Sequence, residues 1–168
     1  MSTSAISSFE ESLSTRGLPL TRTAAADAAD ELTALVEPPA IGTQLPYSGV
    51  SLPENVITEL SPSVLESATV GITPAALAIA DYGSVVIPDD GSGSEHVSLF
   101  ADEHVAVVAA SDVVASMSEA IGELGEQVRD GLTSAIVATG PSATADMGEL
   151  VMGAHGPKVV EVVLVTDR

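Results

Sequence analysis

The chain has 168 residues, of which 45% are hydrophobic, and it carries 24 acidic against 5 basic side chains, a formal net charge of −19. This acidic balance disfavours nucleic acid as a partner, because binding it requires lysines and arginines to displace counterions, and it equally disfavours anionic membrane surfaces. The apolar content is nevertheless too high for a disordered acidic chain, so we expect a folded protein.

The composition also indicates an environment. Lys158 is the only lysine, and small residues take the place of bulky aromatic ones. Charge self-repulsion at −19 is weakened by concentrated salt, so we predict a halophilic source and work in a salt-rich cytoplasm. The sequence contains no stretch of about 18 apolar residues, so we expect no membrane span. The first residues do not resemble a secretory signal. Cysteine is absent, which excludes disulfides, thiolate nucleophiles and iron–sulfur ligation by this chain's own thiolates.

Two helices are predicted in a helical N-terminal part, residues 1–38. The first covers residues 4–15, with Ile6, Phe9 and Leu13 on one face. The second covers residues 23–36, with Thr23 as its N-cap, and ends at a Pro-Pro pair.

Residues 40–63 are rich in proline and glycine and predict a long irregular segment, with a short strand near Ile57. A long loop inside a compact domain is often functional or flexible.

From Ala68 onward, apolar strands alternate with helices. The predicted strands are 68–72, 84–87, 104–109, 134–138 and 158–165; the predicted helices begin at Thr73-Pro74, at Ser111 or Asp112 (running to about Arg129) and over 144–152, and PDDGSGSE is a polar loop. Strands without strict alternation, separated by helices, are typical of a mostly parallel sheet flanked by helices in an α/β fold.

The run GPSATAD, from Gly140 to Asp146, follows the strand 134–138 and opens the predicted helix. The first amides of a helix have no partners within it, so Ser142 is either a simple N-cap or part of an anion site. Asp146 would lie in the first turn, where the helix dipole favours negative charge. The run lacks the Gly-Lys-Ser/Thr ending of a phosphate-binding loop, which argues against nucleoside triphosphate hydrolysis.

The run GAHGP, from Gly153 to Pro157, lies between that predicted helix and the last strand. Because the helix separates the two turns, we expect them at opposite ends of the sheet. His155 then either has a structural role in its own turn or lies near a ligand.

A third run, GITPAALAIADYGS, ends in a tight turn in which Gly83 is expected to have a positive φ. Asp81 is either a capping residue of this turn or a general base. The histidines complete no metal-binding set, and no Gly-x-Ser-x-Gly elbow indicates a hydrolase.

Taken together, these stretches resemble the LUD domain, the family of lactate-utilization protein C. The matching segments are GIT (71–73), AIADYGS (78–84), SLFADEH (98–104), GPSATADM (140–147) and GAHGP (153–157), so the core of the resemblance is residues 66–165 within a single α/β domain of residues 1–168. Three positions depart from the family pattern: Ala143 replaces Lys or Arg, Tyr82 replaces Thr, and Ala101 replaces Pro. Because this departure removes a cation at position 143, we expect weaker anion binding there than in the family.

The resemblance implies a fold similar to ribose-5-phosphate isomerase and the CoA transferases, and cytoplasmic work in L-lactate oxidation to pyruvate beside iron–sulfur subunits. We therefore expect an accessory or ligand-binding subunit for a small carboxylate or phosphorylated metabolite. The alternatives are a stand-alone isomerase or acyl-CoA-handling enzyme with Asp81 as base, and a non-catalytic interaction protein. A homodimer stays open.

The expected ligand-binding set is Gly140, Ser142, Thr144, Asp146, Thr73, Gly83 and Ser84, with Asp81 as candidate catalytic residue and His155 and His104 in structural or partner contacts. No metal and no cofactor are expected.

Overall fold

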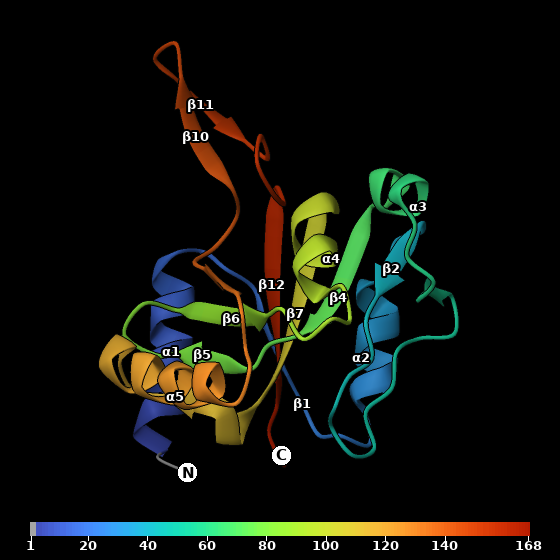
Figure 1. Cartoon of the computed structure of the whole chain (residues 1–168). Helices are drawn as coiled ribbons and strands as arrows, with labels where there is room; N and C mark the ends of the chain where they lie inside the picture. The colour runs from blue at the N-terminus through green and yellow to red at the C-terminus, as the bar shows by residue number, and fades with distance from the viewer. Residues whose placement is uncertain (1–2) are drawn as a thin grey trace.

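The computed structural model describes residues 3–168. Its centre is a parallel sheet of six strands in the order β1-β12-β7-β4-β2-β3 (Figure 1). These strands are β1 (Leu20–Thr23), β12 (Val159–Val165), β7 (Glu103–Ala109), β4 (Val70–Pro74), β2 (Ala40–Gly42) and β3 (Val56–Ile57). The expected α/β class with a mostly parallel sheet is confirmed.

Both faces of the sheet are covered, and the side chains of β12 alternate between them. Val163 and Val165 pack with Leu32 of α2 (Ala28–Leu35), whereas Val162 and Leu164 pack with the apolar face of α1 (Thr3–Thr15). A strand that is buried on both faces needs apolar residues at every position, which explains the uninterrupted apolar run 162–165 in β12. Helices α3 (Pro62–Ser67) and α4 (Ser94–Phe100) contribute to a third apolar cluster.

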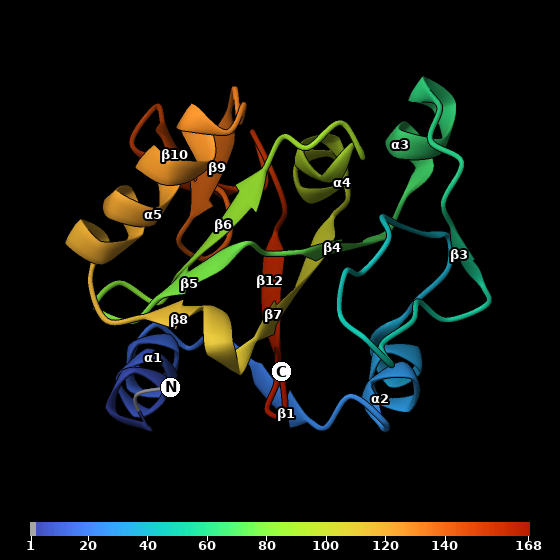
Figure 2. The same cartoon turned by 60° about the horizontal axis from the view of Figure 1, so that its bottom comes forward.

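A second sheet of four strands, in the order β8-β5-β6-β9, lies beside the parallel one (Figure 2). Its strands are β8 (Val113–Val114), β5 (Leu77–Ile79), β6 (Ser84–Pro88) and β9 (Ala135–Ala138). Helix α5 (Met117–Arg129) packs on it through Ala120, beside Ile79 and Val86. The pattern predicts 84–87 and 134–138 as strands of the parallel sheet, but β6 and β9 belong to this second sheet and pair antiparallel with each other.

The predicted helix 144–152 is wrong. The segment forms an antiparallel hairpin of β10 (Ala143–Asp146) and β11 (Glu149–Met152), which projects beyond the rest of the molecule (Figure 1). Met147 and Gly148 form its turn with φ of 48° and 86°. Two consecutive positive φ angles are the geometry of a two-residue hairpin turn, and glycine disfavours a helix interior by about 1 kcal/mol.

The second helix begins later than predicted. Leu20–Thr23 is a strand that pairs parallel with β12, so Thr23 is not an N-cap, and α2 starts at Ala28 after Asp27. Pairing with an established strand outweighs the helix propensity of the alanine-rich sequence, which differs by only tenths of a kcal/mol per residue.

Three further boundaries differ. Thr73-Pro74 opens no helix, because β4 continues through Pro74 to pair with β7. Helix α4 was missed and follows the polar loop. Helix α5 begins later than Ser111 or Asp112, because the residues before it form a 3₁₀ turn, η1 (Ala110–Asp112), and β8. Its cap is Ser116, whose Oγ accepts a 3.3 Å hydrogen bond from the amide of Glu119.

Candidate functional site

The two turns that flank the hairpin meet in space. The amide of Ser142 donates a 2.8 Å hydrogen bond to the carbonyl of Pro157, and the amide of Gly153 donates a 2.9 Å bond to the carbonyl of Ser142. The Ser142 Oγ also accepts a 3.3 Å bond from the amide of His155. The expectation that these turns lie at opposite ends of the sheet is therefore wrong, because a hairpin returns the chain to its starting point whereas a helix would have carried it away.

A cavity of about 280 Å³, which we call the His104 cavity, lies where these turns meet the amino ends of β7 and β12. Its walls also include the last turn of α4, through Ser98 and Leu99. The lining residues are Ser98, Leu99, His104, Ile136, Ala138, Gly140, Ser142, Ala143, His155, Gly156, Pro157 and Val160. Three of the five sequence segments that carry the family resemblance thus supply its walls: SLFADEH, GPSATADM and GAHGP.

His104 connects this cavity to the GIT segment. Its Nε2 lies 2.9 Å from the Thr73 Oγ1, and both side chains are buried. Burial lowers the pKa of His104 from 6.5 to about 4, because the charged imidazolium loses its hydration. The ring is therefore neutral at pH 7 and offers one donor and one acceptor.

The AIADYGS segment contacts the residues next to this cavity without lining it. The Oγ of Ser84 lies 2.6 Å from the Oγ1 of Thr139, the residue before Gly140. Gly83 has the predicted positive φ, 61°, and a Cβ there would lie 3.2 Å from the Cβ of Ser12 in α1. Neither Gly83 nor Ser84 is among the residues that line the cavity.

The polar groups of the cavity are suited to hydrogen bonding. Ser142 Oγ accepts a bond from the His155 amide, so its own proton is available to a ligand. Ser98 donates to the carbonyl of Glu95 at 2.8 Å, which leaves its oxygen as an acceptor. Lys158, adjacent to Pro157, forms a 2.8 Å ion pair with Asp102.

The remaining predicted site residues are dispersed. Asp81 is exposed and lines a different depression, beside Ser12 and Arg16 of the N-terminal segment. Thr144 lies in β10, and the side chain of Asp146 is outside the described part of the structure. The prediction that free helix amides follow Gly140 is wrong, because no helix begins there and the Ser142 amide is bonded to the carbonyl of Pro157.

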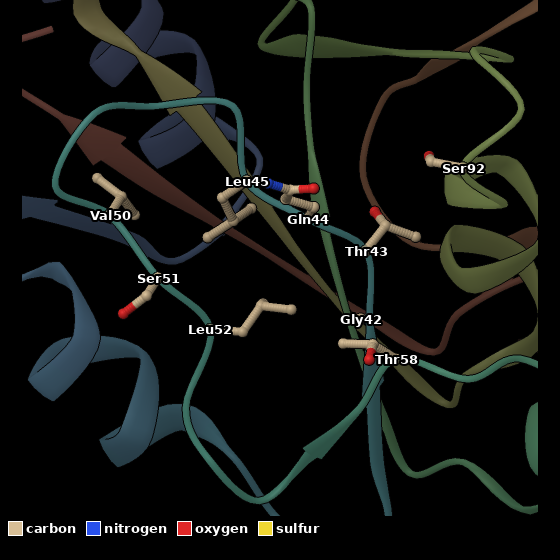
Figure 3. Close-up of a pocket in the computed structure, with 9 residues that line it drawn as sticks. All are labelled: Gly42, Thr43, Gln44, Leu45, Val50, Ser51, Leu52, Thr58 and Ser92. Carbon is tan, nitrogen blue, oxygen red and sulfur yellow. The ribbon is translucent and has the colours of Figure 1, made fainter.

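A second cavity, of about 520 Å³, was missed from sequence and lies at the carboxyl end of β2 (Figure 3). We call it the β2 cavity. Its residues come almost wholly from the irregular segment 40–63, whose length and proline content were the only signal. The lining residues are Gly42, Thr43, Gln44, Leu45, Val50, Ser51, Leu52, Thr58 and Ser92.

Within residues 3–168, no group of three or more histidine or acidic side chains is arranged to hold a metal ion. In the same described range, no helix combines the length and apolar character required to cross a membrane.

These features define a class of α/β protein in which a parallel sheet carries a second, mixed sheet and a projecting hairpin. A DUF162 family protein from Deinococcus radiodurans has the same fold: its crystal structure superposes with a TM-score of 0.73 over 96% of each chain, at 22% sequence identity. The LUD domain family model matches residues 51–165, and the chain belongs to this family.

Several similar proteins are named lactate utilization protein C. The Bacillus velezensis protein is 38% identical over 107 residues, covering 61% of this chain and 44% of the relative. The Bacillus subtilis protein is 36% identical over 107 residues, covering 61% of this chain and 45% of the relative. The Shouchella clausii protein is 30% identical over 131 residues, covering 76% of this chain and 57% of the relative. The chain therefore spans about half the length of these relatives.

Proposed function

We propose that this LUD domain is a ligand-binding subunit of an L-lactate utilization system and that it binds a small carboxylate or phosphorylated metabolite in the His104 cavity. The observation that carries the proposal is the convergence of separate segments on one small space. Residues from SLFADEH, GPSATADM and GAHGP line it, and Thr73 of GIT bonds to its buried histidine.

The size and polarity of the cavity favour a small guest. A volume of about 280 Å³ is just below the range typical of drug-sized ligands. The hydroxyl of Ser142 and the imidazole of His155 can donate to ligand oxygens, and Lys158 adds a positive charge near Pro157. Because Asp102 neutralises that charge in part, affinity for an anion depends mainly on hydrogen bonds and is to be measured in high salt, which screens the net −19.

The names of the relatives support a role in lactate utilization. The partners that we propose are separate iron–sulfur subunits. A chain without cysteine cannot hold an iron–sulfur cluster through its own thiolates, so electrons from lactate would pass to separate iron–sulfur subunits in the cytoplasm.

The test is a titration of the ¹⁵N-labelled protein with L-lactate, pyruvate and ribose 5-phosphate in concentrated KCl. We expect one of these anions to shift the amide resonances of Gly140, Ser142 and His155 in a saturable way. Ser142→Ala should weaken that binding about tenfold, since it removes one hydrogen bond to a charged group. Leu99→Trp, which fills the cavity, should abolish it.

Ser118→Ala is the matched control, because Ser118 is an exposed residue of α5 with no role in the cavity. Absence of binding by all three anions, or equal affinity in Ser142→Ala and Ser118→Ala, would refute the assignment of the ligand to this cavity.

A further inference from the structure

The β2 cavity lies at the point in the parallel sheet where the order of strand addition reverses. From β2 the chain continues to β3 on one side, and it then returns to β4 on the other side of β2. Open α/β sheets bind ligands outside the carboxyl ends of the strands at such a switch point. The His104 cavity, by contrast, lies at the amino ends of β7 and β12, so the two cavities are distinct and share no lining residue.

The walls of the β2 cavity differ in polarity. In Figure 3 Leu45, Val50 and Leu52 lie to one side, with Ser51 between the last two, and the hydroxyl-bearing Thr43 and Ser92 lie to the other. None of the described residues that line it is acidic or basic. Such a surface suits a molecule with an apolar face and several neutral hydroxyl groups.

Gly42 makes part of this wall from bare backbone. A Cβ at this position would lie 3.0 Å from the Val56 Cγ1 and 3.1 Å from the carbonyl oxygen of Ile72. The glycine thus allows β2, β3 and β4 to close together beneath the cavity.

Three hydroxyl groups form a chain at the polar wall, of which Thr43 and Ser92 line the cavity and Ser94 is buried between them. Thr43 Oγ1 lies 2.7 Å from Ser94 Oγ, and Ser94 Oγ lies 2.8 Å from Ser92 Oγ. Thr43 and Ser94 are both buried. Two hydrogen bonds use two of the three hydroxyl protons, so one proton stays free, and each oxygen retains capacity to accept. The chain can therefore both donate to and accept from a ligand hydroxyl.

The charge around the cavity disfavours an anion. The carboxylates of Asp89 and Asp90 accept bonds from the amides of Gly91 and Ser92, at 3.4 and 2.9 Å, so negative charge lies at the Ser92 side. A carboxylate or phosphate here would meet this charge without a lysine or arginine among the described lining residues to offset it.

We propose that the β2 cavity is a second binding site, for a neutral polyhydroxylated small molecule such as a monosaccharide. The hydroxyl chain and the amide of Gln44 bond to the hydroxyls of the ligand, and the leucine and valine side chains pack against its apolar face. The site is independent of the anion proposed for the His104 cavity.

The probes are D-ribose, D-glucose and glycerol, added to the ¹⁵N-labelled full chain in concentrated KCl, with L-lactate as the charged comparison. We expect a monosaccharide to shift the amides of Thr43, Gln44 and Thr58 in a saturable way and to leave those of Ser142 and His155 unchanged. Gln44 is exposed, so Gln44→Leu should keep the fold and weaken binding about tenfold. Gln127→Ala, on α5, is the matched control.

Leu52→Trp provides a second variant, which should remove monosaccharide binding by filling the cavity while leaving the response of Ser142 to anions intact. The proposal is overturned by absence of saturable shifts at Thr43 and Gln44 with every neutral probe, by equal affinity in Gln44→Leu and Gln127→Ala, or by a stronger response of these amides to lactate than to sugars. Failure of the anion site appears instead at Gly140, Ser142 and His155, so the two proposals fail separately.

Discussion

The Nε2 of His104 lies 2.9 Å from the Oγ1 of Thr73, and this hydrogen bond joins the beginning of β7 to the end of β4 inside the protein. Both side chains are almost fully inaccessible, with 1% and 0% exposed. A buried imidazole with a neutral partner favours its uncharged form, and this preference couples the stability of the fold to pH.

The pH dependence has a definite sign. His104 has a pKa of about 4 in the folded protein against 6.5 in the unfolded chain, so between these values the unfolded chain binds more protons. The contribution of His104 to the free energy of unfolding is therefore fully present above pH 6.5. It is lost as the pH falls towards 4, with a slope of up to about 1.4 kcal/mol per pH unit. Urea unfolding of the wild type and His104→Gln at several pH values measures it.

The expected result is a shallower decrease in His104→Gln than in the wild type between pH 6.5 and about 5, above the main titration of the carboxylates. Identical slopes would contradict it. Should the variant fail to fold, NMR titration of the wild-type ring provides the same answer, because a His104 resonance that titrates near 6.5 is incompatible with the burial effect.

Gly71 allows α4 to approach β4 closely. A Cβ at Gly71 would lie 2.7 Å from the carbonyl oxygen of Val97 and 3.0 Å from the Cβ of Ala101. Gly71→Ala should therefore lower the free energy of unfolding by about 1–3 kcal/mol, since the backbone of α4 has to move. Chemical denaturation measures the loss.

Gly122→Ala is the control for this substitution. Gly122 lies within α5 and has nothing within 4 Å of its added Cβ, so alanine should stabilise the helix by up to about 1 kcal/mol. A Gly71→Ala protein as stable as the wild type would show that α4 adjusts without cost.

The hairpin turn is strained at Met147. This residue has a φ of 48° and a side chain that is 99% exposed, so no packing compensates for the left-handed backbone. Met147→Asn should stabilise the hairpin by about 1 kcal/mol, because asparagine tolerates this conformation and favours this type of turn. Met147→Val should destabilise it, since a β-branched residue is costly at positive φ.

Hydrogen exchange of the amides of residues 143–152 is the suitable measurement, because a two-stranded hairpin opens locally. Slower exchange is expected in Met147→Asn and faster exchange in Met147→Val. The same exchange rates in both variants would mean that the turn conformation does not limit the stability of the hairpin.

Stability should rise with salt. At a formal net charge of −19 the folded chain repels itself, and raising KCl from about 0.1 M to about 1 M shortens the Debye length from about 10 Å to about 3 Å. A gain of about 2 kcal/mol would raise Tm by about 4–8 °C for a chain of this size. Thermal unfolding in KCl tests this, since chloride avoids the strong burial-promoting effect of sulfate. A Tm that is constant or falls over this range would count against the halophilic prediction.

Local sequence patterns alone predict the elements whose own residues allow only one secondary structure. The amphipathic spacing of Phe9 and Leu13 predicted α1, and the valine-rich runs predicted β6, β7 and β12, because residues that are apolar on both faces have to be buried inside a sheet. The turn at Gly83 was also predicted, since few residues other than glycine adopt its positive φ.

The elements that were predicted wrongly depend on partners distant in the chain. Leu20–Thr23 is a strand because β12, about 140 residues later, offers its edge, and Pro74 stays extended because β7 pairs with it. The segment 144–152 has residues suited to either state, and the turn at Met147 and Gly148 favours the hairpin.

The two cavities depend on these same distant contacts. The sequence motifs indicate Ser142 and His155 as candidate site residues, but the two lie within hydrogen-bond distance only because the hairpin closes. The β2 cavity is formed by a segment without a regular pattern, so no periodicity could reveal it. Hydrophobic periodicity records which side of an element is buried, whereas a cavity is created by the packing of several elements, and packing is a property of the whole chain.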